Sequence, residues 1–216
     1  MGIVVKTDER ILRFISTKLK NKVFDKAMPA VTYLNDDGKI YIMLVFILLL
    51  KNSSILLGYA VLSSLSTGCL LGEVIIKPIA KRKRPANAPE SHKIPAHKPF
   101  LYSFPSGHAM SSFSVAAVLW HYGCCYKYMF LIIALLISFS RIYLFAHYPS
   151  DVIAGAVLGT LCGRYTVLAA SKYLSKGLLS NANDLRDTIL FAIVLYFMII
   201  TLANIKQIDH RHLRAY

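Results

Sequence analysis

The chain has 216 residues, of which 56% are hydrophobic, and it carries a formal net charge of +14. Soluble domains are usually about 45–50% apolar, and the excess here lies in long uninterrupted runs, so the composition excludes an ordinary soluble domain and indicates a multi-pass membrane protein. The positive charge is expected to face anionic lipid headgroups. No nucleic-acid-binding motif accompanies that charge, so we expect no nucleic-acid partner.

The first predicted element is a basic amphipathic helix over residues 7–28. Apolar residues recur there at every fourth position, and Lys and Arg fill the opposite face. Thr7 or Asp8 can cap its start, and Pro29 can end it. Such a helix is expected to lie in the plane of the lipid headgroups, with binding to a partner protein as the alternative. Residues 33–39 then form a turn.

Six apolar segments follow, and each is a predicted membrane span. They are residues 40–50, 55–76, 105–122, 127–146, 149–170 and 188–205. The first is short of the roughly 20 residues that cross a bilayer, so it either extends at its ends or forms a re-entrant helix.

The predicted fold is therefore all-α: a polytopic bundle of about six transmembrane helices plus the N-terminal interfacial helix. We expect a single integral-membrane domain over residues 1–216, with a catalytic core of about 55–170 and an additional C-terminal span at 188–205. We expect the cell membrane as its location. The oligomeric state stays open.

A long polar loop over residues 77–105 separates the second and third spans. It holds seven Lys and Arg residues and six prolines, and loops of this length favour a functional role. Lys81, Arg82 and Lys83 are interpreted as a charge run facing solvent or headgroups. Glu73 precedes Lys77 by four residues, which predicts a structural ion pair.

His147 and Asp151 lie four residues apart at the predicted start of a helix. A carboxylate that holds Nδ1–H fixes the imidazole tautomer and leaves the Nε2 lone pair exposed. An imidazole held in this way is a competent nucleophile. The pair alone is weak support, because this spacing often arises by chance.

Ser106, Gly107 and His108 open the third apolar helix. Free backbone N–H groups and the helix dipole favour an anion there, and Gly107 lets that anion approach the backbone closely. His108 offers a second proton-transfer group. An ordinary helix cap explains this segment equally well when it is taken alone.

Lys77, Arg84 and Arg141 supply fixed positive charge near these histidines in the predicted topology. A guanidinium group can donate two parallel hydrogen bonds to a phosphate, and it stays charged at physiological pH. Fixed positive charge of this kind is the main catalytic contribution in phosphoryl transfer. The sequence shows no cluster of carboxylates suited to magnesium. We therefore expect neither a metal nor another cofactor.

Together, these residues resemble the three-part signature of the type-2 phosphatidic acid phosphatase superfamily over roughly residues 60–165. The matching segments are Lys77-x6-Arg84-Pro85, Pro105-Ser106-Gly107-His108 and Ser140-Arg141-x5-His147-x3-Asp151. The resemblance implies a helical membrane core and metal-independent hydrolysis of lipid phosphates. The chain departs from the pattern of this superfamily in its basic N-terminal helix and in its additional sixth span.

The resemblance also implies a role for each residue. His147 is expected to attack phosphorus and form a phosphohistidine, with Asp151 orienting it. His108 is expected to protonate the leaving oxygen and then activate water. The phosphate oxygens would be held by Lys77, Arg84, Ser106, Gly107 and Arg141.

The residues of the signature are expected to contact the phosphate and not the lipid tail, so several lipids are candidate substrates. Undecaprenyl diphosphate is slightly preferred, with phosphatidylglycerophosphate and phosphatidic acid as alternatives. A lipid phosphotransferase and a non-catalytic lipid-binding membrane protein are the rival functions. The distribution of Lys and Arg places the site in the cytoplasm, whereas the resemblance favours the outer or lumenal face.

Overall fold

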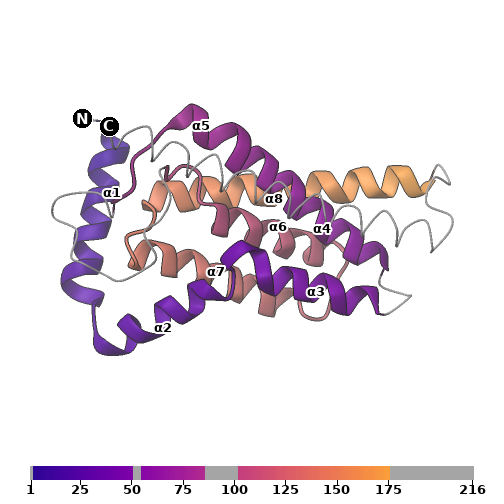
Figure 1. Cartoon of the computed structure of the whole chain (residues 1–216), viewed down its shortest axis with the longest axis horizontal. Coiled ribbons are helices and arrows are strands. Elements are labelled where there is room, and N and C mark those ends of the chain that lie inside the picture. The colour runs from indigo at the N-terminus through magenta and orange to yellow at the C-terminus, as the bar shows by residue number, and fades with distance from the viewer. Residues whose placement is uncertain (1, 51–54, 86–101, 176–216) are drawn as a thin grey trace, which may run out of the picture.

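The computed structural model describes residues 2–50, 55–85 and 102–175, and the regular secondary structure among them is entirely helical, with no strand (Figure 1). The α-helices are α1 (Ile3–Phe14), α2 (Lys22–Tyr33), α3 (Lys39–Leu49), α4 (Ile55–Cys69), α5 (Lys77–Ala80), α6 (Gly107–His121), α7 (Lys127–Tyr143) and α8 (Pro149–Ser175). Shorter turns of other helix types lie at Ile15–Leu19, Asp36–Gly38 and Leu70–Ile76. The predicted all-α class is confirmed for this part of the chain.

Helix α6 is the centre of the bundle and packs against α4, α7 and α8. These helices run roughly along the long axis of the molecule, whereas α1 stands steeply across one end (Figure 1). Helix α1 packs against α8 at that end, and α2 leads from α1 along α7. The N-terminal helices therefore cover the end of the bundle where α6 and α8 begin.

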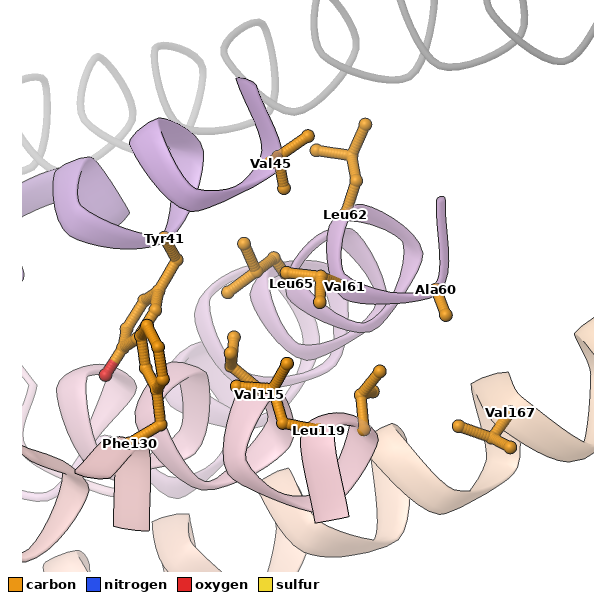
Figure 2. Close-up of a cluster of buried hydrophobic side chains, with 11 residues drawn as sticks. Tyr41, Val45, Ala60, Val61, Leu62, Leu65, Val115, Leu119, Phe130 and Val167 are labelled. Carbon is orange, nitrogen blue, oxygen red and sulfur yellow. The ribbon is translucent and has the colours of Figure 1, made fainter. Parts of the chain in front are cut away.

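An apolar cluster holds α3, α4, α6, α7 and α8 together away from that end. Figure 2 shows Tyr41 and Val45 of α3 facing Leu65 of α4, with the ring of Tyr41 beside that of Phe130. The two ring centroids are 6.3 Å apart, a separation typical of favourable aromatic pairs. Tyr41 and Val45 are fully buried, so α3 is fixed to the bundle.

Helices α6 and α8 approach each other along a row of glycines on α8. A Cβ atom added at Gly155, Gly159 or Gly163 would collide with a backbone carbonyl oxygen of α6 or of its N-cap residue Ser106. Small residues at this spacing allow helix backbones to pack closely in membranes. The contact aligns the starts of the two helices, where the Ser106 N–H donates to the Asp151 carbonyl at 3.0 Å.

Among the residues that the structure describes, two helices are long and apolar enough to cross a membrane, Leu56–Ala80 and Pro149–Lys172. The first runs without a break through α4, the π-helical segment and α5. Helices α6 and α7 have 15 and 17 residues, and the apolar stretch Lys39–Leu48 of α3 is also short. The predicted count of six spans is therefore not confirmed, and residues 188–205 lie outside the described residues.

The predicted single helix over residues 7–28 is wrong, because the chain breaks after a π-helical turn and restarts as α2. Asn21 causes the restart: its side-chain oxygen accepts the N–H groups of Val23 and Phe24 at 3.0 and 2.9 Å. Such a cap satisfies donors that a new helix leaves unpaired. Pro29 lies inside α2 and does not end the helix.

Helix α1 is amphipathic, as predicted, but it starts earlier than the sequence indicated. Its outer side exposes Ile3, Val4 and Phe14, while Leu12 is buried against the bundle. Asp8, predicted as a cap, lies in the middle of the helix and is buried. An acidic residue buried in this position needs partners, and these lie at the candidate site.

Candidate active site

The three charged segments converge at the end of the bundle that α1 crosses. His147 lies in the α7–α8 connection, and Arg84 follows α5. The electrostatic neighbours of the His147 imidazole are Arg84, Arg141, Lys77 and His108. Residues from all three predicted segments therefore surround one buried imidazole.

The hydrogen bonds of His147 define its tautomer. Nδ1 lies 2.7 Å from the carbonyl oxygen of Ser103, and Nε2 lies 2.9 Å from Nη1 of Arg84. A guanidinium group has no acceptor, so Nε2 accepts from Arg84 and the ring proton is on Nδ1. The Nε2 lone pair therefore points toward a cation, at the place where an anionic substrate would be attracted.

The environment of His147 also sets its charge. Its side chain is 1% exposed, and burial lowers its pKa well below the ordinary value of 6.5, aided by the positive charges of Arg84 and Arg141. Desolvation and nearby like charge both oppose protonation. The imidazole is therefore neutral at physiological pH.

Asp151 lies close to His147 but is not its direct hydrogen-bond partner. Oδ2 of Asp151 is 3.8 Å from Nδ1 of His147, farther than the Ser103 carbonyl. The same Oδ2 accepts the backbone N–H of Tyr148 at 3.0 Å, and Oδ1 accepts from Arg82 at 2.6 Å. The carboxylate faces the ring edge at ion-pair distance, while a backbone carbonyl takes the hydrogen bond that the sequence assigned to Asp151.

Arg84 is fixed beside the His147 imidazole by a backbone carbonyl of the α7–α8 connection. Its Nη1 also donates to the carbonyl oxygen of Ala146 at 2.9 Å. Burial lowers the pKa of Arg84 to about 10, although the carboxylates of Glu73 and Asp151 act in the opposite direction. Arg84 therefore remains charged at neutral pH.

The start of α6 has the predicted cap and a close neighbour. Ser106 is buried, and its hydroxyl oxygen accepts the N–H of Ala109 at 3.5 Å. A Cβ at Gly107 would collide with the carboxylate of Glu73. A larger residue here would have to displace the flexible end of the Glu73 side chain, so the close neighbour of Gly107 is an acidic group.

Glu73 and Lys77 form an ion pair, which confirms the prediction made from their spacing. Nζ of Lys77 lies 2.5 and 2.6 Å from the two carboxylate oxygens of Glu73. Lys77 is 7% exposed. The pair brings the lysine to the N-terminus of α6, within reach of the same space as Gly107.

His108 has a partner that sequence reasoning missed. Its Nε2 lies 3.2 Å from Oδ1 of Asp36, in the turn between α2 and α3. Burial acts to raise the pKa of Asp36, but His108 and the guanidinium of Arg141 outweigh it and lower the pKa. Asn35 binds the same region by donating to the His108 carbonyl at 3.1 Å. No motif marks this turn in the sequence.

Arg141 donates from one of its nitrogens and has another that is unpaired. Its Nη1 donates to the hydroxyl of Thr32 at 2.8 Å. Its Nε is buried and has no hydrogen-bond partner among the residues that the structure describes. A buried unpaired donor is costly, and a phosphate oxygen would satisfy it.

The predicted exposure of Arg82 is wrong. Its guanidinium donates to Asp151 and Asp8, each at 2.6 Å, and lies 4.1 Å from the ring centroid of Tyr148. Lys81 and Lys83 beside it are exposed, as predicted. Within the charge run, Arg82 therefore points into the protein and pairs with Asp151 and Asp8, which lie 69 and 74 positions away in the chain.

The donor set of the site is cationic and imidazole-based. In the described ranges, no three His, Cys, Asp or Glu side chains are grouped so that they could hold a metal ion. The arrangement instead offers Lys77, Arg84 and Arg141 to an anion, with two imidazoles nearby. Its chemistry therefore suits a phosphoryl group.

The fold and the site define a helix bundle that carries a cationic, two-histidine site at one end. Residues 53–175 match the PAP2 superfamily, and this match covers more than half of the chain. The chain belongs to the PAP2 superfamily, which confirms the resemblance drawn from the sequence.

Curated relatives share about a third of their aligned residues with the chain. It is 34% identical over 122 residues to an undecaprenyl-diphosphatase of Sulfolobus acidocaldarius, covering 56% of this chain and 59% of that protein. It is 33% identical over 87 residues to the bacitracin transport permease protein BcrC of Bacillus licheniformis, with 40% and 42% covered. A lipid A 4'-phosphatase of Bacteroides thetaiotaomicron is 30% identical over 112 residues, with 47% and 48% covered. The chain thus spans less than two thirds of the length of these relatives.

Two solved structures share the fold. LpxE of Aquifex aeolicus matches with a TM-score of 0.64, covering 77% of this chain and 96% of that one. The transmembrane PAP2-type phosphatidylglycerolphosphate phosphatase of Bacillus subtilis matches with a TM-score of 0.62, covering 80% of this chain and 88% of that one. Both are 24% identical to this chain, a level at which the likeness establishes the fold.

Proposed function

We propose that the protein hydrolyses a phosphate monoester or diphosphate on a membrane lipid, without a metal, through a phosphohistidine on His147. The observation that carries the proposal is the buried neutral imidazole whose Nε2 lone pair faces Arg84. A nucleophile needs an available lone pair, which Nε2 gains when Nη1 of Arg84 donates to a phosphate oxygen instead, and a phosphoryl group needs fixed positive charge. Both requirements meet at this nitrogen.

The first step forms a bond from Nε2 of His147 to the terminal phosphorus and breaks the bond from that phosphorus to the leaving oxygen, which is the lipid oxygen of a monoester or the bridging oxygen of a diphosphate. His108 gives its proton to that leaving oxygen. The phosphorylated ring keeps its Nδ1 proton, which donates to the Ser103 carbonyl, and Asp151 offsets the positive charge that the ring acquires. Arg84 and Arg141 then donate to the phosphate oxygens.

The second step restores the enzyme. A water attacks phosphorus, His108 takes one proton from that water, and the bond from phosphorus to Nε2 breaks. Inorganic phosphate leaves and His147 is again neutral. Asp36 accepts from Nε2 of His108 in the absence of substrate, so it is placed to keep this imidazole oriented between steps.

A membrane lipid is the proposed substrate, and undecaprenyl diphosphate is slightly preferred among the candidates. Relatives named as an undecaprenyl-diphosphatase and a lipid A 4'-phosphatase support a lipid phosphate. Phosphatidylglycerophosphate and phosphatidic acid remain alternatives. The two helices able to cross a bilayer support a multi-pass protein in the cell membrane, with the site at one end of its bundle.

The test is phosphate release by purified protein in detergent, with each of the three lipids, in the presence of EDTA. We expect release from at least one lipid, no release by His147→Ala, and nearly unchanged release by Lys83→Ala, whose side chain is exposed. Strict dependence on added Mg²⁺, or transfer of labelled phosphate to an added alcohol in place of water, would contradict the proposal.

A further inference from the structure

Arg82 connects the N-terminal helix to the proposed catalytic histidine. Its Nη1 donates to Oδ1 of Asp151, and its Nη2 donates to Oδ2 of Asp8, each at 2.6 Å. Asp151 in turn lies 3.8 Å from Nδ1 of His147. A continuous series of charged contacts therefore leads from α1 to the imidazole.

Both acids in this series are buried. Asp8 is 2% exposed and Asp151 is 0% exposed. Buried carboxylates are costly unless they are paired and hydrogen-bonded. Arg82 is the cation that both of them share, so its loss would leave two uncompensated anions beside the active site.

Asp8 is held by more than Arg82. Its Oδ1 accepts the backbone N–H of Ser150 at 2.9 Å, and its Oδ2 accepts the Ser150 hydroxyl. Ser150 is in the first turn of α8, next to Asp151. Asp8 therefore binds the start of α8 directly and also through Arg82, which fixes that turn from the side of α1.

The position of the guanidinium is defined on three sides. It pairs with two carboxylates, donates to the Ser150 hydroxyl at 2.7 Å, and lies over the ring of Tyr148. A planar guanidinium can bridge two acids in a fixed geometry, whereas a lysine ammonium is a point charge on a flexible stem. Burial acts to lower the pKa of Arg82, but the hydrogen bond to Asp8 and the charge of Asp151 outweigh it and raise the pKa.

We propose that Asp8 and Arg82 are positioning residues for phosphoryl transfer: Arg82, held by Asp8, fixes the Asp151 carboxylate at the edge of the His147 ring. The inference rests on the proposed function of His147. It makes the N-terminal helix, which lies outside the matched family region, part of the active site. Neither residue contacts the reacting atoms, and each acts through Asp151.

The test compares Asp8→Asn and Arg82→Gln with matched controls in the full-length protein. The controls are Glu9→Gln, the exposed next residue on α1, and Lys83→Gln, the exposed neighbour of Arg82. For the lipid that the wild type hydrolyses, kcat per active site is expected to fall on the order of 10- to 100-fold, a range typical of supporting residues. KM and both controls should stay within about 2-fold, because the phosphate-binding cations are untouched.

Two further variants separate positioning from a structural role. Arg82→Lys should recover only part of kcat, because one ammonium cannot bridge both acids. Asp8→Asn added to Arg82→Gln should cost little more than Arg82→Gln alone, because the two residues act in series. Active sites are counted by the lipid product released in the first turnover, because it leaves when the phosphohistidine forms.

The outcomes are distinguishable. A fall in the number of active sites with unchanged kcat per site would show a structural role and overturn the inference. Unchanged kcat in Asp8→Asn and Arg82→Gln, with an active wild type, would overturn the inference alone. A wild type that hydrolyses none of the lipids would overturn the proposed function and this inference with it.

Discussion

The same cations that would hold a phosphate also keep His147 ready to attack it. Arg84 donates to Nε2 of His147, and the charges of Arg84 and Arg141 disfavour a proton on this ring. An imidazole in water at pH 6 would be largely protonated and would lack a lone pair. At the level of single residues, the site therefore combines substrate binding with activation of the nucleophile.

This account predicts the protonation state of His147 directly. In protein labelled with ¹⁵N-histidine, the His147 ring should show a protonated Nδ1 and an unprotonated Nε2 at pH 7. It should keep this state at pH 6, because its pKa lies well below 6.5. The signal is assigned by its loss in His147→Asn, and a titration with a midpoint at 6.5 or above would contradict the account.

At the level of elements, the close contact between α6 and α8 determines where Asp151 and Ser106 lie. The glycines of α8 let its backbone reach the carbonyl oxygens of α6, and the starts of both helices then meet through the Ser106–Asp151 backbone hydrogen bond. Two signature segments more than forty residues apart are joined by this packing. The site geometry therefore depends on residues that carry no chemistry themselves.

Gly159→Ala tests this dependence. The added methyl group would collide with the backbone of Met110, and overpacking of this kind costs about 1–3 kcal/mol. We expect a lower thermal unfolding midpoint in detergent and reduced phosphate release. Val157→Leu adds one carbon at a side chain that is 55% exposed and serves as the control. Equal stability of the two variants would show that the α6–α8 contact tolerates separation.

The helices and several of the residues that meet at the candidate site could be predicted because local patterns encode them. Long apolar runs predicted α4, α6, α7 and α8, and the spacing of Glu73 and Lys77 predicted their ion pair. The break at Asn21 was missed because apolar periodicity continues across it, and a side-chain cap outweighed that pattern.

Three side chains at the site could not be predicted because their meaning depends on tertiary contacts. Asp8 looked like a helix cap, Arg82 looked like one of several surface cations, and Asp36 lay in a polar turn. Their partners are 142, 69 and 72 positions away in the chain. No local pattern distinguishes such residues from solvated ones.

At the level of the whole molecule, the candidate site and the α6–α7 connection lie at opposite ends of α6. Lys83 is exposed near the site, and Cys125 is exposed in that connection. If α6 crosses the bilayer, the two positions face opposite compartments. The compartment from which Lys83 is accessible therefore also shows which leaflet supplies the substrate.

Thiol labelling in intact cells tests this arrangement. In a variant that retains Cys125 as its only native cysteine, a membrane-impermeant reagent should label either Cys125 or a cysteine introduced by Lys83→Cys, and not both. Labelling through Lys83→Cys would place the site at the outer face, and labelling of Cys125 would place it in the cytoplasm. Equal labelling of both positions would contradict a membrane-spanning α6.

Mapping the covalent intermediate tests the central claim most directly. Protein mixed with a lipid substrate that carries labelled phosphate, in EDTA, is quenched during the first turnover and digested for mass spectrometry. We predict label on the imidazole of His147 in the wild type and none in His147→Ala. Label on a different residue, or hydrolysis that proceeds with no labelled protein and only with added metal, would contradict the account.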